Sequence, residues 1–248
     1  MSSTTKRVAW VTGGGTGIGR AGAEALVRDG WTVVISGRRA DALATVIKEL
    51  GDLGNHVTAK QLDVSDAAAV QSVADAIVQD HGRIDLLVNS AGVNVPKRSW
   101  EDVTLASWDQ LVDINLNGVM YCMRAVLPTM RAQKDGTIIN VASWAGRIVS
   151  KMTGPAYTAT KHAVYALTHS FNQDECVNGL RACCLAPGEV ATPIMKLRPI
   201  PPSDEVLARM LQPDDLGKTI AFVASMPPHV CMNEILISPT WNRSFMGV

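Results

Sequence analysis

The chain has 248 residues, of which 47% are hydrophobic, so it can build a sizeable core, and α/β sheets of this length often form one domain. Lysine plus arginine and aspartate plus glutamate balance at 23 each. This balance provides no basic field that would attract nucleic acid or an anionic membrane, so we expect neither as a partner.

Short β-rich runs alternate with longer stretches of helical periodicity along the chain. The predicted strands are 8–12, 32–36, 56–62, 84–88, 136–141, 180–185 and 234–237, and the predicted helices are 20–29, 41–50, 66–80, 107–133 and 156–178. This alternation is typical of parallel strands joined by right-handed crossovers, and uniformly apolar strands fit a sheet covered on both faces. The sequence predicts one domain over 1–248, a doubly wound Rossmann-type parallel sheet in three α/β/α layers.

Residues 192–212 interrupt this alternation. Prolines recur in and directly after the segment, which excludes a core strand, and only residues 205–211 have helical spacing. A long insertion after the carboxyl end of a strand is either a functional lid or a variable loop. Its place at the ligand-facing edge of such a sheet favours a substrate lid.

The cysteines and the first residues bear on the compartment. Five cysteines form no CxxC pair, and their number is odd. Residues 1–7 lack the apolar stretch of a signal peptide, and no apolar run reaches the length of a membrane span. We expect reduced thiols, no metal site and a cytoplasmic protein.

A glycine-rich stretch, Thr12-Gly13-Gly14-Gly15-Thr16-Gly17-Ile18-Gly19, joins the first predicted strand to the first predicted helix. Glycine lets the backbone approach a pyrophosphate closely, and the helix that follows offers free N–H groups and the positive end of its dipole. A tight turn without a ligand is the alternative. The position between an N-terminal strand and a helix favours a dinucleotide site.

The second predicted strand ends in Ser36-Gly37-Arg38-Arg39, where NAD-binding folds place an acidic residue for the ribose. The two arginines precede the amino end of the next helix, where the dipole disfavours cations. A bound anion such as a 2′-phosphate explains this better than solvated surface charge. We expect NADP(H), with NAD(H) as the alternative.

Tyr157 and Lys161 are four residues apart at the start of a predicted helix, so they share one helical face. A nearby ammonium favours the phenolate form of tyrosine, whose ordinary pKa is about 10. A tyrosine tuned in this way can act as general acid or base. The spacing also occurs by chance, but Asn140 to Ser143, Asn89 to Gly92 and Pro187-Gly188 all follow strands toward the same edge of the sheet.

Taken together, these motifs resemble the short-chain dehydrogenase/reductase family, in its branch of about this length, over nearly the whole chain. The residues that carry the resemblance are Thr12-Gly13-xxx-Gly17-Ile18-Gly19, Leu62-Asp63-Val64, Asn89-Ser90-Ala91-Gly92, Asn115, Ser143, Tyr157-xxx-Lys161 and Pro187-Gly188-xxx-Thr192. The chain departs from the family at Ser90, where Asn is common, and at Thr16, where some NADP-preferring members carry a basic residue.

The resemblance implies a role for each matching residue. Tyr157 would exchange the proton and Ser143 would hydrogen-bond the substrate oxygen. Lys161 would hold the nicotinamide ribose and lower the pKa of Tyr157, and Asn115 would order a water that links Lys161 to solvent. The expected cofactor-binding residues are Thr12, Gly13, Gly15, Thr16, Gly17, Ile18, Gly19, Arg38, Arg39, Asp63, Val64, Asn89, Ala91, Gly92, Tyr157, Lys161, Pro187, Gly188, Val190 and Thr192.

The expected function is hydride transfer between NADP(H) and a carbonyl or secondary alcohol in a small-molecule substrate. Two alternatives stay open, namely an NAD-linked alcohol dehydrogenase and a non-catalytic sensor that only binds the nucleotide. The substrate itself does not follow from the fold. Lys196 and Arg198 in the 192–212 segment either clamp an acidic substrate or are solvated loop charges.

The helices predicted at 107–133 and 156–178 are apolar over more of their circumference than one sheet-facing stripe requires. Self-association would bury this surplus. Members of the family that the chain resembles assemble in this way, so we expect a homotetramer or a homodimer.

Overall fold

The computed structural model describes residues 6–246, and its strands form one parallel sheet in the order β3-β2-β1-β4-β5-β6-β7. The predicted doubly wound parallel sheet is therefore confirmed. The strands are β1 (Val8–Thr12), β2 (Thr32–Gly37), β3 (Val57–Gln61), β4 (Leu86–Asn89), β5 (Gly136–Val141), β6 (Leu180–Pro187) and β7 (Glu234–Ile237).

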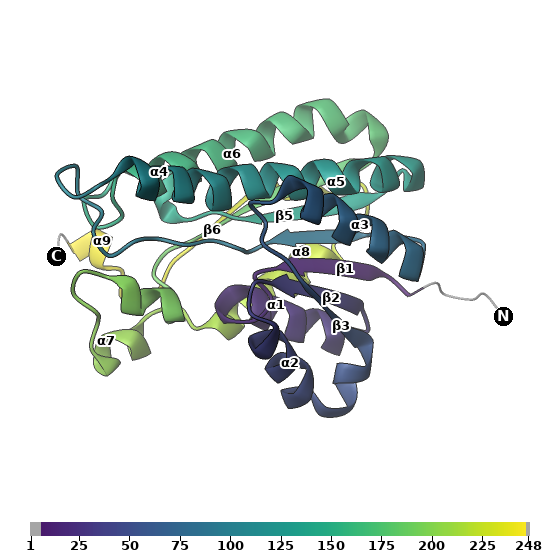
Figure 1. The fold of residues 1–248 in the computed structure, drawn as a ribbon, viewed down its shortest axis with the longest axis horizontal. Helices are drawn as coiled ribbons and strands as arrows, with labels where there is room; N and C mark the ends of the chain where they lie inside the picture. The colour runs from purple at the N-terminus through teal and green to yellow at the C-terminus, as the bar shows by residue number, and fades with distance from the viewer. Residues whose placement is uncertain (1–5, 247–248) are drawn as a thin grey trace.

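Helices cover both faces of this sheet (Figure 1). The helices α3 (Ala67–His81), α4 (Leu105–Val112), α5 (Gly118–Gln133) and α6 (Pro155–Glu175) lie on one side, and α1 (Gly17–Arg28), α2 (Ala40–Glu49) and α8 (Pro213–Ser225) lie on the other. Shorter helices, α7 (Asp204–Arg209) and α9 (Arg243–Met246), lie near the carboxyl ends of the strands.

Successive residues of β1 point to the two different cores. Val8 and Trp10 pack in the core under α3, α5 and α6, whereas Ala9 and Val11 pack in the core under α1, α2 and α8. This is the two-residue period of a strand that is buried on both faces. The Trp10 indole N–H donates to the Ser36 hydroxyl at 2.9 Å, which satisfies the polar atom of a fully buried side chain.

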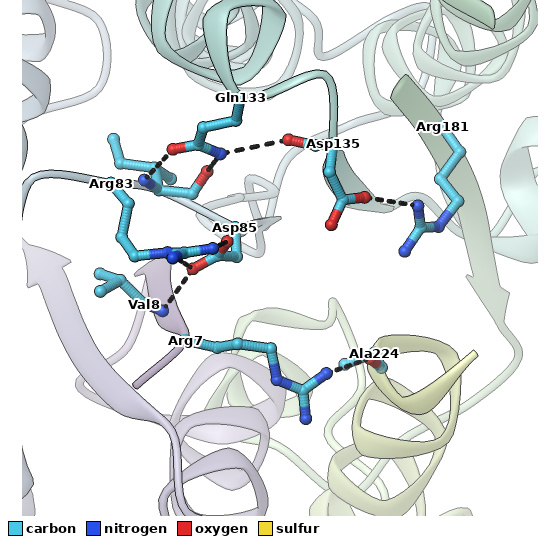
Figure 2. Close-up of polar contacts among 9 residues, drawn as sticks. Arg7, Val8, Arg83, Asp85, Gln133, Asp135, Arg181 and Ala224 are labelled. Atoms are coloured by element: carbon cyan, nitrogen blue, oxygen red, sulfur yellow. Dashed lines mark hydrogen bonds and ion pairs between the residues drawn. The ribbon is translucent and has the colours of Figure 1, made fainter. Parts of the chain in front are cut away.

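A polar network fastens the amino ends of the central strands (Figure 2). Asp85 accepts hydrogen bonds from the Val8 amide at 2.8 Å and from the Nε and Nη2 of Arg83. The Arg181 guanidinium pairs with Asp135 at 2.9 Å, just before β5. These charges lie at the edge of the sheet opposite the carboxyl ends, so they stabilise the fold at a distance from the cleft described below.

The sequence prediction was wrong about two helical regions. It missed α8, because Pro213 was grouped with the proline-rich segment, although proline suits the first turn of a helix. The helix predicted over 107–133 is interrupted, because α4 and α5 are separated by a π-helical segment at Asp113–Asn117. The short helix predicted at 205–211 is found as α7, shifted by one or two residues.

The topology creates the cleft that a ligand needs. β1 pairs with β2 on one side and with β4 on the other. The direction in which successive strands are added to the sheet therefore reverses between β1 and β4. Ligands of doubly wound sheets bind in the crevice outside the carboxyl ends of such strands. Within the part of the chain that the structure describes, no helix is long and apolar enough to cross a membrane.

Candidate active site

The glycine-rich turn between β1 and α1 is pressed against the loop that follows β4. Gly13 has a φ of +66°, and a Cβ at this position would lie 2.7 Å from the Ala91 amide nitrogen. The Thr12 hydroxyl accepts from the amides of Ser90 at 3.2 Å and Ala91 at 3.3 Å, which holds the two loops together. Only a residue without a side chain fits at position 13, which leaves the backbone itself as the wall of the cleft.

The amino end of α1 is open to a ligand. Thr16 is the N-cap residue, in extended conformation, and its side chain makes no capping hydrogen bond. The first N–H groups of α1 therefore have no side-chain partner from the cap, and the positive end of the helix dipole is directed at the same place. This arrangement fits a pyrophosphate.

A cavity of about 420 Å³ extends from this turn to the ends of β2 and β3. Its wall includes Arg38 and Arg39 after β2 and Asp63 and Val64 after β3. Burial raises the pKa of Asp63, but hydrogen bonds from Ser65 and the charge of Arg38 outweigh this and hold the pKa below its usual value. The end of the cavity thus carries exposed guanidinium groups beside one ionised carboxylate.

A second cavity of about 360 Å³ shares the glycine-rich turn with the first and continues toward β5 and β6. Ser143, Tyr157 and Lys161 line it together, as the sheet-edge argument predicted. The two cavities share Gly13, Thr16, Ala91, Gly92 and Val93, so they are parts of one cleft along the carboxyl edge of the sheet.

Helix α6 positions two of these three side chains. It starts at Pro155, which suits the first helical position, so Tyr157 lies in the first turn and Lys161 one turn later. The Lys161 Nζ donates to the Val141 carbonyl at 2.8 Å and lies 5.6 Å from the centroid of the Tyr157 ring. Ser143 follows β5, and its hydroxyl hydrogen-bonds Tyr157 and accepts from the Ala145 amide at 3.1 Å.

Burial has the largest effect on the pKa values of Tyr157 and Lys161. It raises the pKa of the Tyr157 phenol, while the hydrogen bond to Ser143 and the charges of Arg98 and Arg198 lower it. Burial also lowers the pKa of Lys161 to about 8. The cations that favour the Tyr157 phenolate in this structure are thus Arg98, which the sequence patterns did not single out, and Arg198, for which they left a substrate clamp and a solvated loop charge open.

Asn115 lies inside the π-helical segment and is fully buried. Its side chain bonds the main chain of Val93, accepting from the amide at 2.8 Å and donating to the carbonyl at 2.9 Å. A Cβ on Gly92 would lie 3.4 Å from the Asn115 amide oxygen and 3.7 Å from the Lys161 Nζ. Asn115 is therefore close to Lys161 and fixes the loop that borders the cleft.

Most of the predicted cofactor residues line the cleft, but four predicted site residues do not. Thr12 and Gly19 hold the glycine-rich turn together, and a Cβ on Gly19 would clash with the Gly13 carbonyl oxygen. Asn89 donates to the Asn140 side chain at 2.9 Å, between β4 and β5. Asn115, as described, supports the loop behind the cleft. These residues shape the cleft from behind its surface.

The segment 192–212 forms part of the wall of the second cavity. Ile194, Met195 and Leu197 line it, although the sequence patterns did not single them out. The ends of the segment are fastened by main-chain bonds, from Ala191 N to Leu211 O at 2.8 Å and from Leu211 N to Glu189 O at 3.0 Å. The apolar side chains of Ile194, Met195 and Leu197 gave no chemical signal in the sequence, because only the fold brings them to the cleft.

The chain is similar in sequence to a known protein family and its members. A family model described as short chain dehydrogenase matches residues 7–199. An uncharacterized oxidoreductase of Staphylococcus aureus is 34% identical over 239 residues, which cover 96% of this chain and 100% of the relative.

Solved structures are similar over almost the full chain. An alcohol dehydrogenase from the archaeon Thermococcus sibiricus, in complex with 5-hydroxy-NADP, has a TM-score of 0.86 at 27% identity and covers 96% of this chain and 98% of its own. A serine dehydrogenase in its closed form with NADP+ has a TM-score of 0.84 at 29% identity, with 94% of each chain covered. A metagenomic short-chain oxidoreductase with NADP has a TM-score of 0.82 at 31% identity and covers 97% of this chain and 100% of its own.

Proposed function

Because the chain belongs to the short-chain dehydrogenase family and is an oxidoreductase, we propose that it uses Ser143, Tyr157 and Lys161 to interconvert a carbonyl and a secondary alcohol with NADP(H). The observation that carries this proposal is the convergence of the three side chains in one cavity that continues into the glycine-rich turn. A phenol and a hydroxyl meet there, where a substrate oxygen can bind both.

The residues of the cleft divide the work. When bound, the nicotinamide supplies or accepts the hydride. Tyr157 gives its proton to the substrate oxygen in reduction and takes it back in oxidation. Ser143 donates a hydrogen bond to the same oxygen and so stabilises the charge that develops on it. Lys161 holds the nicotinamide ribose. Together with a water that Asn115 orders, it returns a proton to the Tyr157 phenol after reduction of the substrate.

The preference for NADP(H) over NAD(H) rests on the end of the first cavity. Arg38 and Arg39 are exposed there after β2, close to where the adenosine ribose is held in sheets of this topology. A 2′-phosphate accepts paired hydrogen bonds from guanidinium groups, whereas the 2′-hydroxyl of NAD leaves these cations unpaired. The structures similar to this chain that hold NADP are consistent with this preference.

The 192–212 segment is the substrate lid in this proposal. The β-bridge between Val190 and Leu211 holds the two ends of the segment together. The residues between these ends can therefore move while the ends stay in place. Its apolar side chains would close over the substrate and exclude water from the reacting atoms.

We further propose a cytoplasmic homotetramer or homodimer. All five cysteines are free thiols, as a reducing compartment requires. Large apolar side chains are exposed on α4, where Leu105 is 84% exposed, and on α8, where Phe222 is 52% exposed. A second copy of the chain would bury them, and light scattering on the purified protein measures the assembly directly.

The proposal is tested with purified protein by NADPH fluorescence and by oxidation of NADPH in the presence of a panel of ketones and aldehydes. We expect saturable binding of NADPH, weaker binding of NADH and turnover of at least one carbonyl compound. Binding without turnover of any carbonyl or alcohol would favour the non-catalytic sensor. Tighter binding of NADH than of NADPH would favour the NAD-linked alcohol dehydrogenase.

A further inference from the structure

Arg98 is a buried cation beside the catalytic cavity. It lies in the loop between β4 and α4 and is only 8% exposed. Its Nη2 donates to the Leu197 carbonyl at 2.6 Å, and Leu197 lines the cavity. Its stem is packed against the residue before α6, since a Cβ on Gly154 would lie 2.9 Å from the Arg98 Cβ. Arg98 therefore sits between the helix that carries Tyr157 and the 192–212 segment.

The guanidinium of Arg98 is incompletely satisfied. Its Nε is buried and has no hydrogen-bond partner among the residues that the structure describes. Burial lowers the pKa of Arg98, and so does the nearby charge of Arg198, whereas Tyr157 raises it. An arginine keeps its charge in proteins, so an unmatched buried guanidinium destabilises the folded state unless an anion joins it.

Among residues 6–246, no ion pair joins a carboxylate to Arg98. The Glu189 carboxylate is 2.6 Å from the Arg198 guanidinium and also pairs with Arg243. One carboxylate thus serves two arginines, and Arg98 adds a third cation to the group. Because Arg98 and Arg198 both lower the pKa of Tyr157, their charges lie within electrostatic reach of the phenol.

We propose that Arg98, supported by Arg198, binds a carboxylate of the substrate, so that the preferred substrates are hydroxy acids and oxo acids. A carboxylate matches the planar fork of a guanidinium. Neither Arg98 nor Arg198 lines the cavity, so the carboxylate would reach Arg98 when the 192–212 segment, whose Leu197 carbonyl accepts from Arg98, shifts. It would also offset the excess of positive charge beside the reacting oxygen. This inference rests on the proposed function, since it assigns the substrate class of the same cavity.

The test compares matched acids and neutral esters. Oxidation of 2-hydroxybutyrate and of 3-hydroxybutyrate is measured beside that of their methyl esters, with saturating NADP+. In the wild type we expect kcat/KM for at least one acid to exceed that for its ester by at least about 10-fold, the size of one charge-assisted hydrogen-bond pair. Arg98→Gln should remove this preference. It should lower kcat/KM for the acid by about 10- to 100-fold and kcat/KM for the ester by less than about 3-fold.

Two further variants control for folding and for surface charge. Arg98→Lys keeps the positive charge but not the planar guanidinium. It should therefore fold, and its kcat/KM for the acid should fall less than that of Arg98→Gln. Arg28→Gln removes an exposed arginine at the carboxyl end of α1 that lines neither cavity, and it should leave kcat/KM for both acid and ester unchanged. NADPH fluorescence and circular dichroism confirm that each variant is folded. Equal losses for acid and ester in Arg98→Gln, or no preference in the wild type, would overturn the carboxylate site.

A binding measurement separates this inference from the proposed function. Propionate and inorganic phosphate are titrated calorimetrically into the NADP+ complex of the wild type and of Arg98→Gln. We expect propionate to bind the wild type and to lose at least about 10-fold in affinity in the variant. Such binding without turnover of any hydroxy acid would keep the subsite and reject the proposed reaction. Turnover of neutral alcohols without propionate binding would keep the reaction and reject the subsite, and tighter binding of phosphate than of propionate would overturn the carboxylate assignment.

Discussion

Replacement of Lys161 by methionine should change how the stability of the protein depends on pH. Lys161 is 4% exposed, and burial lowers its pKa from 10.5 to about 8. Since one pKa unit is worth about 1.36 kcal/mol, the charged side chain destabilises the folded state by about 3 kcal/mol at pH 7. The folded protein loses this charge as the pH rises through 8, whereas the unfolded chain keeps it up to 10.5.

The free energy of unfolding of the wild type should therefore rise with pH relative to Lys161→Met. The expected gain is about 1 kcal/mol between pH 7 and pH 9 and about 3 kcal/mol when both states are deprotonated. Loss of the hydrogen bond to the Val141 carbonyl lowers the free energy of unfolding of the variant by the same amount at every pH. It therefore shifts the plot of this free energy against pH without changing its slope.

Urea unfolding followed by circular dichroism, without nucleotide, measures the two curves at pH 7, 8, 9 and 10. Lys48→Met is the matched control, because Lys48 is exposed on α2 and its removal should leave the slope unchanged. Parallel curves for the wild type and Lys161→Met would show that Lys161 carries no burial penalty and would refute the reasoning.

Three other substitutions test separate parts of the account. Arg38→Gln should weaken NADPH binding by about 10-fold and NADH binding by less than about 2-fold, as measured by fluorescence titration; equal losses would contradict a 2′-phosphate contact. Gly19→Ala should abolish nucleotide binding, because its Cβ would clash with the Gly13 carbonyl and force the turn to shift; retention of affinity within about 2-fold would contradict this close approach. Trp10→Phe removes the hydrogen bond to Ser36 and leaves a cavity in the core, so urea unfolding should show a loss of about 2 kcal/mol, and no loss would contradict the packing described.

The sequence predicted the sheet well because its strands carry strong local signals. Segments such as Val8–Thr12 and Gly136–Val141 are mostly apolar and are followed directly by a turn or loop, so their limits were predicted correctly. The helix at Pro213–Ser225 was missed because proline is both a turn residue and a good first helical residue. The π-helical segment at Asp113–Asn117 left no mark in the periodicity, since it widens only one turn.

The candidate site was predictable to the extent that its residues follow strands or share a helix face. Ser143 follows β5 and Tyr157 lies in the first turn of α6, so topology alone brought them to one edge of the sheet. Arg98 could not be found in this way, because nothing in its loop shows that the side chain is buried between two distant segments. Thr12 was predicted as a cofactor residue from its motif, but its hydroxyl is engaged with the loop after β4.

The most direct test of the central claim is the turnover of Tyr157→Phe with its nucleotide affinity measured in parallel. The phenol is proposed as the only group that passes a proton to the substrate oxygen, so its removal should lower kcat by at least about 100-fold. NADPH should still bind within about 3-fold of the wild-type affinity, since loss of one hydroxyl leaves the glycine-rich turn and Lys161 in place. Undiminished turnover in this variant would contradict the account.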